Sequence, residues 1–154
     1  MTVVAGFEFP DGLHYQAEDQ VWARLEGDGT ATVGITAFGV HQAGGEIFMC
    51  RPKTLGSVVE QRRSVAVVEV AKAIVSVKSP VGGRIVAINE LLAATPELVH
   101  RDPYGAGWIA RLALADFAAD AALLVIGVGV APAMQHQAWL FRQADSADVP
   151  GADG

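Results

Sequence analysis

The stretch VVEVAKAIVSVKSP, residues 67–80, decides how the fold of this chain is interpreted. Valine and isoleucine recur on both sides of Lys72 in short runs that are typical of β-strands. A lysine inside a buried strand would lose its hydration, which costs several kcal/mol. We therefore predict two strands, Ser64–Val70 and 73–77, joined at a hairpin tip around Ala71-Lys72-Ala73, where the ammonium group reaches solvent.

The turn at this tip lacks the Asn-Gly or Asp-Gly pair that hairpins prefer. An enzyme that modifies a lysine needs a protruding amine with small neighbours, and Ala71 and Ala73 provide such neighbours for Lys72. A lysine that is merely solvated fits the same residues, so the spacing alone leaves both interpretations open.

Short strands also flank this hairpin. The β-rich runs Val21–Leu25 and Thr30–Ile35 are separated by Glu26-Gly27-Asp28-Gly29, and Asp-Gly between apolar runs is a strong hairpin signal. Close turns leave no room for crossover helices, so a mainly β sandwich or barrel is predicted. The other predicted strands are 46–50, 57–59, Gly83–Ile88 and 108–114. Because side chains alternate between the two faces of a strand, we predict that one face of the central hairpin is apolar. This face is formed by Val65, Val67, Val75 and Val77.

The C-terminal part has a helical pattern. Residues 116–127 are compatible with a helix, and residues 131–144 place Met134, Ala138 and Phe141 on one helix face. With 154 residues and 51% hydrophobic composition, the chain suits one cored domain. We assign this domain to residues 1–130, a helix packed on it to 131–144 and a disordered tail to 145–154.

Composition restricts the partners. The net charge of −6 with no basic stripe argues against nucleic acid. The sequence contains no run of about 18 apolar residues that would predict a membrane span, and its N-terminus has no signal-peptide pattern. A cytoplasmic protein is therefore expected. Cys50 is the single cysteine, which excludes an internal disulfide. The four histidines, His14, His41, His100 and His136, share no spacing that would predict a metal site.

Four blocks resemble, in order, the H protein of the glycine cleavage system: VWARLEGDGTATVGIT, VVEVAKAIVSVKSPVGGRIVAIN, ATPELVHRDPYGAGW and IARLALADF. They cover roughly residues 13–117. The resemblance implies a barrel-sandwich hybrid fold with small flanking helices, and a lipoyl group in amide linkage on Lys72. It also implies that Glu69 is recognised by the lipoate-attaching enzyme, while Ala71 and Ala73 keep the approach open. Biotinyl carriers typically flank their lysine with methionines, which argues against biotin.

Two positions depart from the family pattern. Val21 stands where H proteins usually have the glutamate of H-E-W, and Ser76 stands where they usually have an acid four residues after the lysine. Those carboxylates are thought to receive a cationic aminomethyl group, which Val21 and Ser76 cannot do. This pattern resembles the lipoate-binding proteins of heterodisulfide-reductase-like sulfur oxidation, so we expect a carrier of sulfur intermediates. The alternative is a glycine cleavage carrier working with the P, T and L proteins.

In either pathway the chain is expected to be a cofactor-carrying subunit and not an enzyme, because the cofactor supplies the chemistry. A stand-alone enzyme and an unmodified binding module remain alternatives, though neither explains the four blocks. Cys50 beside Arg51 is either a reactive thiol or a small buried side chain. Arg51 and Lys53 are either a basic lip for an anionic cargo or solvated charges. Three aromatic residues are expected to serve packing: Trp22, Tyr104 and Trp108.

Overall fold

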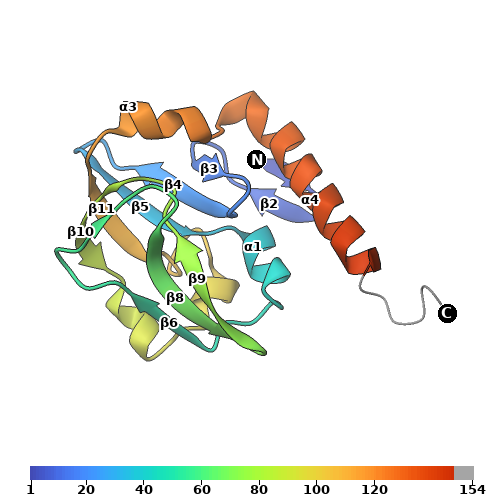
Figure 1. The fold of residues 1–154 in the computed structure, drawn as a ribbon, viewed down its shortest axis with the longest axis horizontal. Helices are drawn as coiled ribbons and strands as arrows, with labels where there is room; N and C mark the ends of the chain where they lie inside the picture. The colour runs from blue at the N-terminus through green and yellow to red at the C-terminus, as the bar shows by residue number, and fades with distance from the viewer. Residues whose placement is uncertain (148–154) are drawn as a thin grey trace.

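A computed structural model describes residues 1–147, which form three antiparallel β-sheets with short helices and one long C-terminal helix around them (Figure 1). The strands are β1 (Thr2–Val4), β2 (Phe7–Phe9), β3 (His14–Gln16), β4 (Val21–Leu25), β5 (Thr30–Ile35), β6 (Met49–Pro52), β7 (Val58–Val59), β8 (Ser64–Val70), β9 (Ala73–Lys78), β10 (Gly83–Ile88) and β11 (Ala110–Leu114). The α-helices are α1 (Ala37–Gln42), α2 (Leu98–Arg101), α3 (Phe117–Asp120) and α4 (Val130–Ala147). Three 3₁₀ turns cover Glu90–Ala93, Ala121–Leu123 and Gly127–Gly129.

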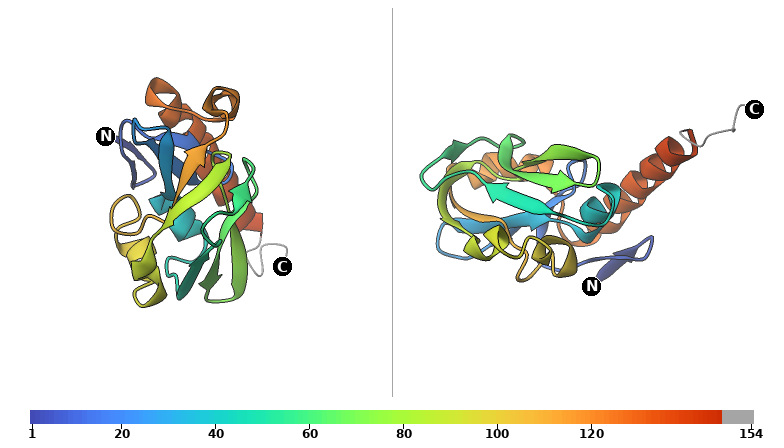
Figure 2. Two further views of the ribbon diagram at one scale, coloured as in Figure 1. Left: turned by 90° about the vertical axis from the view of Figure 1, so that its left-hand side faces the viewer. Right: turned by 90° about the horizontal axis from the view of Figure 1, so that it is seen from below.

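The two larger sheets form two layers, as Figure 2 shows. One has the order β3-β4-β5-β11-β10-β7 and the other β6-β8-β9. Their facing sides contribute buried valines from both layers, among them Val21, Val33, Val65 and Val68, to one hydrophobic core. This arrangement confirms the mainly β, barrel-sandwich prediction. Of the helices within residues 1–147, none is both long and apolar enough to span a membrane.

The β4–β5 hairpin matches the predicted residues. Asp28 accepts hydrogen bonds from the backbone and hydroxyl of Thr30, which fixes the turn. Trp22 on β4 is fully buried against Gly34, where a Cβ atom would lie 2.6 Å from the indole. The indole Nε1 donates to the carbonyls of Ile35 and Pro103. Trp22 therefore serves packing, as predicted.

The β8–β9 hairpin has the predicted position but a different inner face. A bulge between Ser64 and Ala66 places both Val65 and Ala66 in the core. Val67 then pairs with Ser76 on the outer side, while Val68 and Val77 point inward. The prediction that Val67 shares a face with Val75 and Val77 is wrong, because one extra residue reverses the alternation beyond it.

Several other elements differ from the prediction; strand β11, for example, begins at Ala110 and not at residue 108. Strand β6 begins at Met49 and not at residue 46, because the Ile47 N–H donates to Nδ1 of His100 (2.9 Å), outside any ladder. Residues 116–127 do not form one helix. Helix α3 ends at Asp120, and further on Val125 forms two backbone hydrogen bonds with Tyr15, both 2.9 Å, which require extended backbone.

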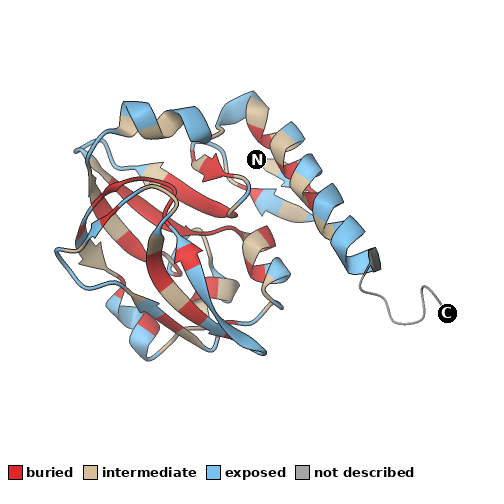
Figure 3. Cartoon of the chain, in the orientation of Figure 1, coloured by how far each residue is buried: buried red, intermediate tan, exposed pale blue. Residues whose placement is uncertain are grey.

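Helix α4 covers a second core. Met134 and Ala138 are buried with Phe38, and Phe141 packs beside them, which confirms the predicted apolar helix face (Figure 3). The helix begins one residue earlier than predicted and continues to Ala147, the last described residue, because no glycine or proline follows Pro132 of its first turn up to that point. The predicted disorder is therefore wrong for residues 145–147, and the rest of that prediction lies outside the described residues.

Candidate functional site

Lys72 lies at the end of the β8–β9 hairpin, where the last strand pair is Val70 with Ala73. Ala71 and Lys72 form a two-residue loop, and neither has positive φ. Both are exposed, as is the whole tip of the hairpin in Figure 3. Within residues 1–147, the Lys72 amine has neither a hydrogen bond nor an ion pair. The amine is therefore accessible to a modifying enzyme.

The residues predicted around the lysine are gathered at this tip. Ala71 and Ala73 flank Lys72 and are exposed, so only methyl groups limit the approach to the amine. Glu69 is exposed on the outer side of the hairpin, paired with Met49 of β6 and Ile74 of β9. These positions fit an amide-linked arm, because the amine is free and its neighbours are small.

A small hollow lies beside the shaft of this hairpin, between β9 on one side and β4, β5 and α1 on the other. Its volume is about 130 Å³, below the roughly 300–1,000 Å³ of pockets that enclose whole small molecules. Val21 and Ser76, the two positions that depart from the H-protein pattern, both line it. The remaining lining residues are Asp19, Ile35, Gly39, Gln42, Ala43, Val68, Val75 and Val77. The walls therefore combine apolar side chains, such as Val75, with polar ones, among them Asp19 and Gln42.

The carboxylate of Asp19, which also lines the hollow, was not predicted from the sequence. Asp19 has a side chain only 8% exposed and accepts two hydrogen bonds from Arg62, at 2.9 Å from Nε and 3.1 Å from Nη2. The hydrogen bond and charge of Asp19 raise the pKa of Arg62 above its ordinary value. The two residues lie in separate turns, so no local pattern in the sequence predicts the pair. Val21 and Ser76 supply no carboxylate, but the hollow that they line contains the carboxylate of Asp19.

Cys50 has the second of its two predicted roles. It is buried in the core, and burial raises the pKa of its thiol to about 12. Arg51, although next in sequence, points to the outer face of the sheet, since its pairing partner is Val67. The reactive-thiol interpretation is therefore wrong.

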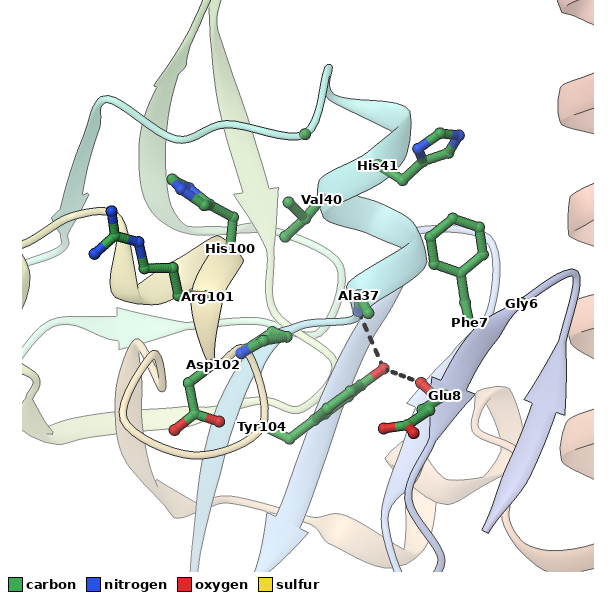
Figure 4. Close-up of a pocket in the computed structure, with 12 residues that line it drawn as sticks. Gly6, Phe7, Glu8, Ala37, Val40, His41, His100, Arg101, Asp102 and Tyr104 are labelled. Atoms are coloured by element: carbon green, nitrogen blue, oxygen red, sulfur yellow. Dashed lines mark hydrogen bonds between the residues drawn. The ribbon is translucent and has the colours of Figure 1, made fainter.

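A larger cavity has no lining residue from the lysine hairpin. It measures about 510 Å³ and lies between β2, α1 and the segment after α2 (Figure 4). At its edge the Tyr104 hydroxyl donates to the Glu8 carbonyl (2.7 Å) and accepts from the Ala37 N–H (3.0 Å). Burial raises the pKa of Tyr104, so it stays a neutral donor. Tyr104 thus ties three segments together, in agreement with its predicted packing role.

The fold, with an exposed lysine on a two-residue hairpin tip, is that of the class of proteins that carry a covalently attached arm. Residues 13–136 match the family model described as glycine cleavage H-protein. The chain belongs to the glycine cleavage H-protein family. Members of this family are lipoyl-carrier subunits that hold lipoate covalently on a lysine and are not catalysts themselves.

Individual relatives agree with this assignment. The chain is 42% identical over 109 residues to the glycine cleavage system H protein of Marinobacter nauticus, covering 71% of this chain and 82% of the relative. It is 40% identical over 122 residues to glycine cleavage system H protein 2 of Aquifex aeolicus, covering 79% and 75%. The crystal structure of a glycine cleavage system H protein from Mycobacterium marinum superposes with a TM-score of 0.63 at 30% identity, covering 69% of this chain and 86% of that one. All three relatives are described as glycine cleavage system H proteins, so the similarity favours the glycine cleavage alternative over the expected sulfur-oxidation pathway.

Proposed function

We propose that Lys72 is the lipoylated residue and that the chain is the carrier subunit of a glycine cleavage system. The observation that carries this proposal is the free, exposed Lys72 amine on its two-residue tip. The deprotonated Nζ attacks the carboxyl carbon of an activated lipoate and forms a C–N bond, while the activating group leaves with its electron pair. The second ammonium proton passes to a base on the attaching enzyme. Bound lipoate supplies the redox-active sulfurs.

The hollow beside β9 suits the end of such an arm. Ser76 is four residues from Lys72, about 13 Å along the strand at roughly 3.3 Å per residue. About twelve bonds separate the lysine Cα from the first lipoyl sulfur, about 14 Å in extended form. The apolar part of the hollow's wall, which includes Val21 and Val75, favours contact with a hydrocarbon ring. The partners are the lipoate-attaching enzyme and the P, T and L proteins, in the cytoplasm.

Asp19 gives this hollow a site for a cationic cargo. A carboxylate has about four acceptor positions, and Arg62 occupies two of them. An aminomethyl ammonium can therefore bind the remaining positions, even though Val21 and Ser76 offer no charge. The Asp19→Asn variant should lower the yield of aminomethylated carrier by about tenfold, the effect of losing roughly 1.4 kcal/mol of binding. Glu18→Gln, which changes the neighbouring exposed carboxylate, is the control.

The test of attachment is mass spectrometry of the intact protein and its tryptic peptides after incubation with a lipoate ligase, lipoate and ATP. One lipoyl group on Lys72 is expected, with none on Lys72→Arg and full loading on Lys78→Arg. An unmodified Lys72 beside a loaded control carrier would overturn the proposal.

A second function is favoured by one observation: neither Val21 nor Ser76 contributes a carboxylate to the hollow. A sulfur intermediate on the arm bears no ammonium, so it would tolerate this loss and could be exchanged with a heterodisulfide-reductase-like complex. The two functions separate in an assay with glycine, the P protein and lipoylated carrier. Release of carbon dioxide supports glycine cleavage, whereas its absence with an active P protein supports the sulfur carrier.

A further inference from the structure

The outer face of the β6-β8-β9 sheet is a surface that the proposed function does not use. Register places Arg51, Val67 and Ser76 side by side on this face, since Arg51 pairs with Val67 and Val67 with Ser76. In Figures 1 and 2, none of the helices within residues 1–147 lies over it. A sheet face in a small β protein is usually covered or polar. This one is uncovered and has an apolar centre.

The charges on this face have the opposite sign to those of the whole chain. Three exposed cations belong to it, Arg51, Lys53 and Lys78, against one carboxylate, Glu69. The chain as a whole has a formal charge of −6. Within residues 1–147, none of these three cations takes part in a salt bridge. Acylation of Lys72 leaves this positive face intact.

The face also contains a hollow next to two of the cations. It has a volume of about 400 Å³ and is lined by Arg51 and Lys53, with Pro52, Ala66 and Val67 as its apolar part. An apolar centre with a charged rim is the usual composition of a protein interface. The combination of a hollow and a charged rim therefore favours an interface over isolated solvated charges.

The face continues directly behind the lysine. Ile74, 66% exposed, is two residues from Lys72, and Lys78 is six residues away, so the surface extends about 7–20 Å from the tip along β9. An enzyme that holds the tip in its active site must therefore contact this face. A positive face is complemented by an acidic one.

We propose that the outer face of the β6-β8-β9 sheet, with Arg51 and Lys53, docks an acidic surface beside the active site of the lipoate-attaching enzyme. This inference rests on the proposed lipoylation of Lys72. Glu69 lies between the cations and the tip, where it fixes the register of docking by repelling a misplaced carboxylate. Docking by charge raises the rate of encounter, and its effect is screened by salt.

The experiment measures kcat/KM for lipoylation of the full chain, by intact mass, with a purified lipoate ligase at about 20 mM and about 300 mM NaCl. Arg51→Glu with Lys53→Glu should lower kcat/KM about tenfold at low salt, with the difference shrinking at high salt. The matched control is Arg101→Glu with Arg142→Glu, the same charge change at exposed sites on α2 and α4. Arg51→Gln with Lys53→Gln should give an intermediate loss. Thermal melts of all variants check folding.

Equal rates for the two double-glutamate variants, or a wild-type rate that is independent of salt, would overturn the docking surface while leaving lipoylation in place. Failure of the wild-type Lys72 to be modified would remove the proposed function and this inference together. Sedimentation at low salt addresses a second copy as occupant: a dimer dispersed by Arg51→Glu with Lys53→Glu would also overturn the proposal. A monomer with salt-dependent lipoylation supports it.

Discussion

At the scale of single residues, the structure distinguishes the amine of Lys72 from the thiol of Cys50. Lys72 is exposed on a turn, whereas Cys50 is buried under the three-stranded sheet. A nucleophile must be both deprotonated and reachable. Lys72 is reachable, and an enzyme can deprotonate it. Cys50 meets neither condition, so its thiol does not compete with the amine of Lys72.

The raised pKa of Cys50 leads to a test. With a pKa of about 12, the thiolate fraction at pH 8 is about 10⁻⁴, against roughly a quarter for an ordinary thiol. Native protein should react with a disulfide reagent at least a hundredfold more slowly than protein unfolded in guanidinium chloride. Absorbance of the released thiolate gives both rates. Similar rates in native and unfolded protein would show that Cys50 is accessible.

Asp19 shows where residue-level prediction fails. Its role depends on Arg62, which is brought to it by the fold of a different turn and has a positive φ of 67°. Val21 and Ser76 could be predicted to act together, because each was compared with a family position. Asp19 had no such position, so only three-dimensional contact reveals it.

At the scale of elements, local sequence rules succeeded where the turn chemistry is local. The β4–β5 hairpin has Asp28 bonded to Thr30, and both strands have the predicted bounds. The face of β8 could not be predicted, because the bulge near Val65 has no glycine signal. Residues 116–127 likewise contain good helix formers, yet pairing of Val125 with Tyr15 overrides that propensity.

Helix α4 is held mainly by one buried face, which can be tested by truncating Met134. Its side chain is 1% exposed, and its sulfur accepts a hydrogen bond from Nε2 of the buried Gln20. Met134→Ala should lower the free energy of unfolding by about 2–4 kcal/mol, because it leaves a cavity and removes one of the two acceptors of the Gln20 amide nitrogen, the other being the Ala17 carbonyl. Leu140→Ala on the exposed face should change it by less than about 0.5 kcal/mol.

Urea denaturation followed by tryptophan fluorescence gives both values. Equal losses for the two variants would mean that α4 is not anchored through this face. An unchanged free energy for Met134→Ala would mean that the second core, with Phe38 and Ala138, contributes no stability of its own.

At the scale of the whole molecule, the two sheets separate two tasks. The three-stranded sheet ends in the tip that bears Lys72, and the six-stranded sheet supplies Val21 and Ile35 to the far wall of the hollow. The hollow therefore exists only when both layers are packed together. A free hairpin could be lipoylated but could not shelter the end of the arm.

Filling the hollow should expose the end of the lipoyl arm without affecting attachment of lipoate to Lys72. Val75 pairs with the buried Val68 on the inner side of the sheet and is 38% exposed at the edge of the hollow, so Val75→Phe can occupy the space. Lipoylation of Lys72 should be unchanged, since residues 69–73 stay intact. After reduction, the arm's thiols should be alkylated by iodoacetamide faster than in the wild type, approaching the rate of free dihydrolipoamide. Ala118→Phe, at an exposed position on α3, should alkylate like the wild type. Mass spectrometry of timed samples gives these rates, and identical rates for Val75→Phe and the wild type would show that the two sheets do not shelter the arm.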